Sequence, residues 1–91
     1  MYALVTPEPF LRHARKFFRK HPDQKPVFAE RLEALRRDPF DPSLGLHPLR
    51  GKLEGLFAIR LTHSYRLTLT LALREGEIVL LDIGSHDEVY R

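Results

Sequence analysis

The last third of the chain constrains the fold more than any other stretch. From residue 65 to residue 73, a tyrosine and four leucines occupy every second position, and arginine, threonine or alanine lies between them. This period of two predicts a strand with one face in the core and the other facing water or a ligand. The polar, glycine-containing segment 74–77 predicts a hairpin connection. The apolar run 78–83, polar only at Asp82, then predicts a central strand.

Two helices are predicted ahead of this hairpin. Thr6 is expected to cap the first helix with its hydroxyl, and Pro7 suits the first helical position. Apolar residues recur at helical spacing between residues 10 and 18, and lysine and arginine surround them. Asp23 is expected to cap the second helix, and Asp38-Pro39 to end it. The apolar stripe of the second helix consists of Phe28, Leu32 and Leu35.

Two further apolar runs, at residues 2–5 and 56–61, predict the remaining strands. The order is therefore β-α-α-β-β-β. It predicts an α+β fold in which a helical hairpin packs on one face of a small, mainly antiparallel four-stranded sheet. The chain has 91 residues, and we find no internal repeat, low-complexity tract or linker. A single domain spanning residues 1–91 is expected, large enough for one core.

Composition excludes several classes of protein. Cysteine is absent, which rules out a disulfide framework and a thiolate metal site. No apolar run approaches the roughly 20 residues of a membrane span, and no signal peptide opens the chain. These features predict a soluble, cytoplasmic protein without membrane association.

The segment 47–66 is strongly basic. It contains one acidic residue and four cationic ones, which are Arg50, Lys52, Arg60 and Arg66. Arg60 and Arg66 are expected on the polar faces of neighbouring strands, where their planar guanidinium groups suit a phosphate. A phosphate-bearing partner is therefore one interpretation of this segment. The other is a set of solvated charges, with the two arginines bridged to Asp82 or Glu88 at little energetic gain.

The segment that follows the last predicted strand contains two residues, His86 and Tyr90, that could take part in catalysis or binding. His86 can exchange a proton near neutral pH, and Tyr90 can stack on a base or donate to a phosphate. The alternatives are a surface histidine and an aromatic side chain that closes the core. His47, His63 and His86 lack the spacing of metal ligands on one element, so neither a metal nor a cofactor is expected.

Several of these features together resemble the RelE/ParE superfamily of bacterial toxins. The first is the order of the elements. The others are the segment Leu49-x-Gly51-x-Leu53-x-Gly55, the strand start Tyr65-Arg66-Leu67 and the ending Ile83-Gly84-Ser85-His86-Asp87-Glu88-Val89-Tyr90. The similarity spans nearly the whole chain, and within the superfamily it is greatest to the YafQ and YoeB/RelE branches.

The resemblance implies the toxin of a type II toxin–antitoxin system, held inactive by an antitoxin protein. The toxins of these branches are ribosome-dependent mRNA endonucleases, or mRNA interferases, which cut mRNA in the ribosomal A site without a metal. The substrate 2′-hydroxyl attacks the adjacent phosphate, and the products are a 2′,3′-cyclic phosphate and a free 5′-hydroxyl. Such a reaction needs a base, an acid and cations beside the charge that develops on the phosphate oxygens.

The resemblance also implies roles for residues of this chain. His86 and Tyr90 match the catalytic histidine and the aromatic residue of the C-terminal motif, and His47 matches a histidine of YafQ-like enzymes. Which histidine is the base and which the acid is left open. Ser64 departs from the pattern, because YafQ-like enzymes have an aspartate there. The residues implied in catalysis are His47, Arg66, His86 and Tyr90, and those implied in substrate binding are Arg50, Lys52 and Arg60.

A non-catalytic binding module is the alternative, either a DNA gyrase inhibitor of the ParE type or a decayed toxin. The ParE branch generally lacks the ending that contains His86 and Tyr90, so this ending favours the ribonuclease. The hypotheses differ in one structural respect, because the enzyme needs its catalytic residues together on one concave face. Codon preference, the identity of the antitoxin and any homo-oligomer are not predicted by the sequence.

Overall fold

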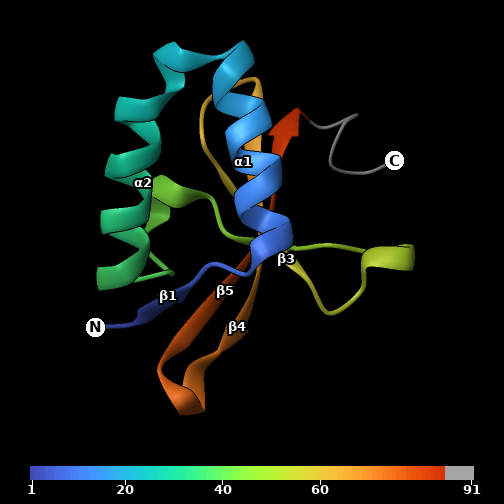
Figure 1. The fold of residues 1–91 in the computed structure, drawn as a ribbon. Coiled ribbons are helices and arrows are strands. Elements are labelled where there is room, and N and C mark those ends of the chain that lie inside the picture. The colour runs from blue at the N-terminus through green and yellow to red at the C-terminus, as the bar shows by residue number, and fades with distance from the viewer. Residues whose placement is uncertain (86–91) are drawn as a thin grey trace.

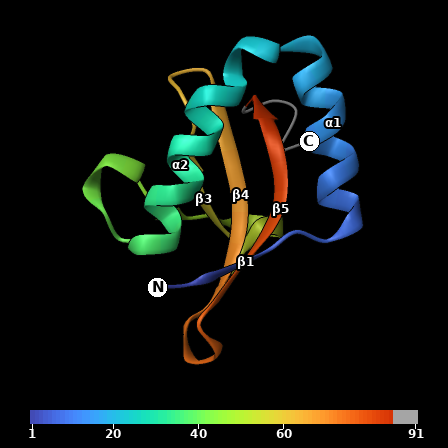
Figure 2. The same cartoon turned by 60° about the vertical axis from the view of Figure 1, so that its left-hand side comes forward.

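A computed structural model describes residues 1–85 of the chain, which are coloured in Figure 1. Two helices, α1 (Glu8–Lys20) and α2 (Lys25–Arg37), run antiparallel and cover one face of a sheet (Figures 1 and 2). The sheet has five strands in the order β1-β5-β4-β3-β2. The strands are β1 (Ala3–Val5), β2 (His47–Pro48), β3 (Phe57–Arg60), β4 (Tyr65–Ala72) and β5 (Glu77–Ser85).

This architecture confirms the predicted α+β fold class. Neighbouring strands pair antiparallel except β1 and β5, which are parallel. The sheet has one strand more than predicted, because the two-residue β2 forms where no strand was expected. β2 lies at the edge of the sheet and carries His47, so this extra strand brings a predicted site residue into the sheet.

The predicted caps of both helices are wrong. Pro7 has extended backbone angles (φ −59°, ψ 154°) and directly precedes α1, so Thr6 lies one residue too early to cap the helix. A short 3₁₀ turn, Pro22–Gln24, precedes α2. The carboxylate of Asp23 accepts a hydrogen bond from the Gln24 side chain at 2.9 Å instead of capping the helix. Within residues 1–85, neither helix is long and apolar enough to cross a membrane.

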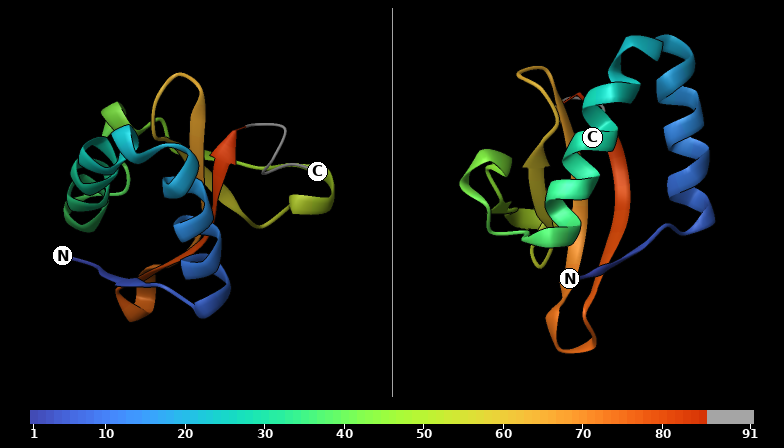
Figure 3. Two further views of the ribbon diagram at one scale, coloured as in Figure 1. Left: turned by 45° about the horizontal axis from the view of Figure 1, so that its top comes forward. Right: turned by 90° about the vertical axis from the view of Figure 1, so that its left-hand side faces the viewer.

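Figure 3 shows the helical hairpin and the sheet as two layers. The core lies between the hairpin and the facing side of the sheet. The buried side chains of the helices are Phe10, Ala14, Phe17 and Leu35. The strand side chains of this core are Ile59, Leu67, Leu69, Ile78, Leu80 and Ile83. Ala58 and Thr68 are also buried, but they project from the other face of the sheet. The apolar residues of the predicted alternation in β4 therefore face the helices, and the polar residues between them face the other side.

A β-bulge in β5 decides which of its residues enter the core. Pairing with β4 is regular up to Leu80, and then Asp82 rather than Leu81 lies opposite the next residue of β4. Without the extra residue, strict alternation would place Asp82 on the same face as Leu80, inside the core. Because of the bulge, Ile83 instead of Asp82 projects into the core, where it is 5% exposed. Asp82 leaves the core, and its carboxylate meets the Nδ1 atom of His13 at 3.0 Å.

Candidate active site

One face of the sheet gathers three of the predicted site residues. In an antiparallel pair, residues opposite each other project from the same face. The neighbouring pair, Ile59 and Leu67, is fully buried under the helices. Arg60 and Arg66 therefore project from the other face. His47 lies opposite Ala58, which shares that face with Arg60. The register therefore places His47, Arg60 and Arg66 on the face away from α1 and α2.

The two arginines lie directly opposite each other in the register of β3 and β4. Like charges directly opposite each other in a sheet repel. The side chain of Arg60 is exposed, and no ion pair within residues 1–85 neutralises it. On the other side of Arg66 the register places Gly84, which adds no side chain. The arrangement suits an anion that accepts hydrogen bonds from the guanidinium groups.

A short turn before β2 positions His47. The carboxylate of Asp41 caps the 3₁₀ turn Pro42–Leu44 by accepting the backbone N–H of Ser43 at 2.9 Å. Hydrogen bonds from the backbone and the hydroxyl of Ser43 lower the pKa of Asp41 below its usual value. The turn ends at Gly45, whose φ of 62° is a left-handed conformation that glycine adopts without strain. The carbonyl of Gly45 is then 2.9 Å from Nδ1 of His47.

This contact defines the tautomer of His47. A carbonyl oxygen accepts hydrogen bonds only, so Nδ1 of His47 must carry the proton that it donates to Gly45. In the neutral ring, the lone pair is then on Nε2. The side chain is half-buried on an edge strand, which limits its rotation. His47 therefore has the tautomer and the fixed orientation that a general base requires.

Gly45 also makes room for Arg60. A β-carbon added at Gly45 would lie 3.0 Å from Nη2 of Arg60, whereas one added at Gly76, which has a similar φ of 67°, meets nothing within 4 Å. Gly45→Ala and Gly76→Ala should therefore carry a similar backbone penalty, about 1 kcal/mol of unfolding free energy, measured by thermal unfolding. Only Gly45→Ala is expected to weaken binding of inorganic phosphate or oligoribonucleotide as well. Equal binding by the two variants would contradict a role for Gly45 in placing Arg60.

The remaining predicted site residues are not brought into this arrangement by the described structure. Arg50 and Lys52 are exposed on the segment 49–56, which projects away from α1 and α2 (Figure 1). His86 and Tyr90 lie outside the described residues. Within residues 1–85, no group of three or more histidine, aspartate or glutamate side chains could hold a metal ion.

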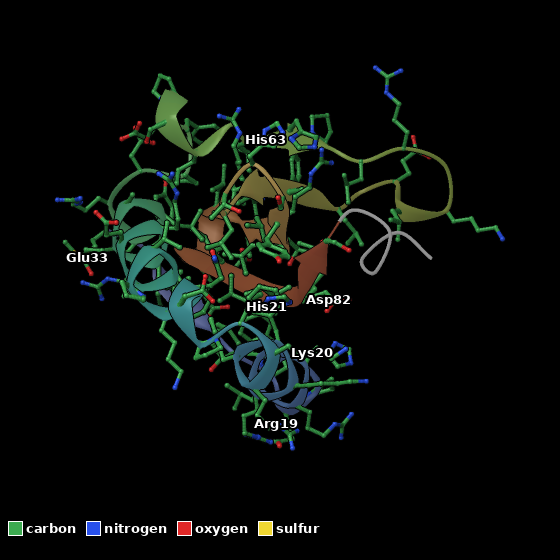
Figure 4. The ribbon with its side chains drawn as sticks, turned by 90° about the horizontal axis from the view of Figure 1, so that it is seen from above. Arg19, Lys20, His21, Glu33, His63 and Asp82 are labelled. Carbon is green, nitrogen blue, oxygen red and sulfur yellow. The ribbon has the colours of Figure 1, made fainter. Side chains whose placement is uncertain are left out.

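A second polar cluster was not predicted from the sequence. His13, Lys16 and Lys20 of α1 line a depression beside the end of β5, together with His21 and Asp82. Figure 4 shows Lys20, His21 and Asp82 near one another at this end of the sheet. The helical spacing of the α1 residues is visible in the sequence. Their proximity to Asp82 is not, because it depends on how α1 packs against β5.

Comparison with solved structures reveals proteins with a similar fold. The chain is 27% identical to a copper-bound mutant toxin from Helicobacter pylori, which superposes with a TM-score of 0.79 over 98% of this chain and 99% of that one. YafQ from Escherichia coli is 13% identical, with a TM-score of 0.80 over 100% of both chains. A chain of the RelBE2 toxin–antitoxin complex from Mycobacterium tuberculosis is 24% identical, with a TM-score of 0.70 over 93% and 98%. Neither a protein-family model nor a curated protein sequence matches the chain.

These similarities extend over the whole length of the described domain and of its relatives. They define the class first: a small α+β domain of the kind found in bacterial toxins. Within that class, the chain has the fold of the RelE/ParE toxin superfamily, and the resemblance predicted from its motifs is confirmed.

Proposed function

We propose that this protein is the toxin of a type II toxin–antitoxin system and acts as an mRNA endonuclease. One observation carries the proposal: His47, Arg60 and Arg66 share one face of the sheet, so a group that can transfer a proton lies on the same face as two cations suited to a phosphate. The similarity to toxin structures supports the first part of the proposal. The YafQ-like motifs that contain His47 and His86 support the second.

The proposed reaction needs no metal or cofactor. One histidine, His47 or His86, removes the proton of the substrate 2′-hydroxyl, and the 2′-oxygen forms a bond to the adjacent phosphorus. The bond from phosphorus to the 5′-oxygen breaks, and the other histidine returns a proton to that oxygen. Arg60 and Arg66 stabilise the negative charge that grows on the equatorial oxygens in the transition state. Tyr90 is proposed to stack on a base next to the scissile bond.

The proposal includes two partners. The substrate is mRNA in the ribosomal A site, which places the protein in the cytoplasm, and Arg50 and Lys52 are proposed to contact its backbone. A cognate antitoxin protein would hold the toxin inactive. Of the similar structures, the RelBE2 and YoeB–YefM complexes are toxins with their antitoxins, which supports this partner.

The test is induced expression in a bacterial host, with primer extension to map cuts in a translated reporter mRNA. The wild type is expected to cut within codons only while the reporter is translated. Arg60→Ala should reduce cutting by about 10²- to 10³-fold, the usual loss when one group that stabilises transition-state charge is removed. His86→Ala should abolish it. Arg74→Ala removes an exposed cation in the connection between β4 and β5 and is the matched control.

Three results would each contradict a part of the proposal. Growth arrest with intact mRNA would indicate the ParE-type gyrase inhibitor instead. Cutting that persists unchanged in Arg60→Ala would separate the activity from this face of the sheet. Absence of both growth arrest and cutting in the host would favour a decayed toxin, provided that the purified protein is folded.

A further inference from the structure

The depression beside the end of β5 has a volume of about 200 Å³ and is lined mainly by α1. Its α1 residues, His13, Lys16 and Lys20, follow the spacing i, i+3, i+7 and so form one stripe along the helix. His21, at the end of α1, continues the stripe and lies 3.3 Å from the hydroxyl of Tyr65. The stripe is therefore held against the sheet at both ends, by Asp82 at His13 and by Tyr65 at His21.

The charge in this depression is positive and uncompensated. Lys16 and Lys20 are one helical turn apart, where like charges destabilise a helix. Within residues 1–85, neither lysine takes part in an ion pair. Asp82 is acidic, but its Oδ1 atom already meets Nδ1 of His13 at 3.0 Å and accepts the N–H of Ile83 at 2.8 Å. The two exposed ammonium groups are therefore available to bind an anion.

The depression and the arginine pair flank the same end of β5. Gly84 pairs with Arg66 of β4. Asp82, two residues earlier in β5, lines the depression together with residues of α1. β1 pairs with β5 only as far as Val79, so β1 does not cover the outer edge of β5 beyond that residue. The arginines project from the face away from α1, so a single nucleic-acid strand that contacts both the arginines and the lysines would pass around this uncovered edge of β5.

We propose that Lys16 and Lys20 form a second phosphate subsite for the same RNA strand whose scissile phosphate lies at Arg60 and Arg66. The inference rests on the proposed function and extends it along the substrate. The ligand is a phosphodiester of single-stranded RNA. A lysine ammonium binds phosphate as a point charge and does not read bases, so the subsite adds affinity and orientation without sequence preference. His13, oriented by Asp82, forms the wall of the subsite.

The experiment measures binding, so it is independent of cleavage. Fluorescence anisotropy follows a labelled oligoribonucleotide of about 12 nucleotides as salt increases, with the purified chain and no ribosome. Lys16→Gln combined with Lys20→Gln is expected to flatten the slope of log K against log salt by about 1.4 and to weaken binding by about 25-fold near 0.1 M salt. Arg37→Gln combined with Arg74→Gln removes two exposed charges at the opposite end of the fold and is the control. Its effects on the salt slope and on the affinity should be much smaller than those of the lysine variant.

A dinucleotide and the variant Arg60→Gln complete the design. A dinucleotide has one phosphodiester and cannot occupy two phosphate sites at once, so the lysine effect should be much larger with the longer strand. An unchanged salt slope in the lysine variant, while Arg60→Gln weakens binding, would overturn the subsite and leave the proposed function intact. If only the lysine variant lost affinity and Arg60→Gln bound RNA as the wild type does, the proposal that one RNA strand contacts both sites would be wrong. Wild-type protein that binds no RNA would overturn the inference, and the mRNA mapping would then test the proposed function separately.

Discussion

Replacing His47 with alanine is expected to lower translation-dependent mRNA cleavage by about 10²- to 10⁴-fold, the usual contribution of a positioned general acid or base. The structural reason is the 2.9 Å contact between Nδ1 of His47 and the carbonyl of Gly45, which leaves Nε2 free to exchange the proton. Cleavage should be measured in a reconstituted translation system, where the amount of folded toxin is known. The unfolding temperature should change little, because the ring is only half-buried.

His63 supplies the matched control for this prediction. It is an exposed histidine in the connection between β3 and β4, so His63→Ala removes the same imidazole from outside the proposed site. Its cleavage rate should stay within a few-fold of the wild type. If both variants retained full activity, His47 would have no part in proton transfer, and the alternative base His86 would have to act alone. Equal losses in both would indicate an effect on the fold.

Replacing Leu67 with alanine is expected to destabilise the protein by about 2–5 kcal/mol, because a buried leucine loses its packing and leaves a cavity. Leu67 is 0% exposed in the middle of β4, opposite Ile59 on one side and Ile83 on the other. A domain of this size has roughly 5–15 kcal/mol of unfolding free energy in total. The unfolding temperature should therefore fall by roughly 10–30 °C in calorimetry.

Leu73 is the appropriate comparison, since it follows β4 directly and its side chain is 44% exposed. Leu73→Ala should change the unfolding free energy by about 0.5 kcal/mol or less. The ratio between the two leucine variants tests whether Leu67 lies in the core while Leu73, just beyond the strand, lies at the surface. Similar losses at both positions would contradict this difference in burial.

The sequence was sufficient for the architecture because the relevant patterns are local. The alternation in residues 65–73 specifies one buried face whatever strand lies beside it, and the helical spacing of Phe10, Ala14 and Phe17 specifies the face of α1. The neighbouring positions of Arg60 and Arg66 were also predictable. The connection between β3 and β4 is short, and a short connection allows few registers between two antiparallel strands.

The position of His47 could not be predicted in the same way. It depends on the two-residue β2, which is too short to produce a pattern and forms only by pairing with the edge of β3. The helix caps failed for a related reason. Thr6 and Asp23 are both good capping residues, but the backbone at Pro7 and the 3₁₀ turn Pro22–Gln24 shift each helix start.

By itself, the sequence determined the order of the two helices and of every described strand except β2, the buried faces of β4 and of the helices, and the family of folds to which they lead. Only the tertiary structure decided which side of β5 carries Asp82. Sequence alternation would have put it beside Ile78 and Leu80 in the core, and the bulge at Leu81 avoids this. A buried, unpaired carboxylate is too costly to keep in an apolar core. The strand therefore bulges, and Asp82 meets His13, a residue that no local pattern connects to it.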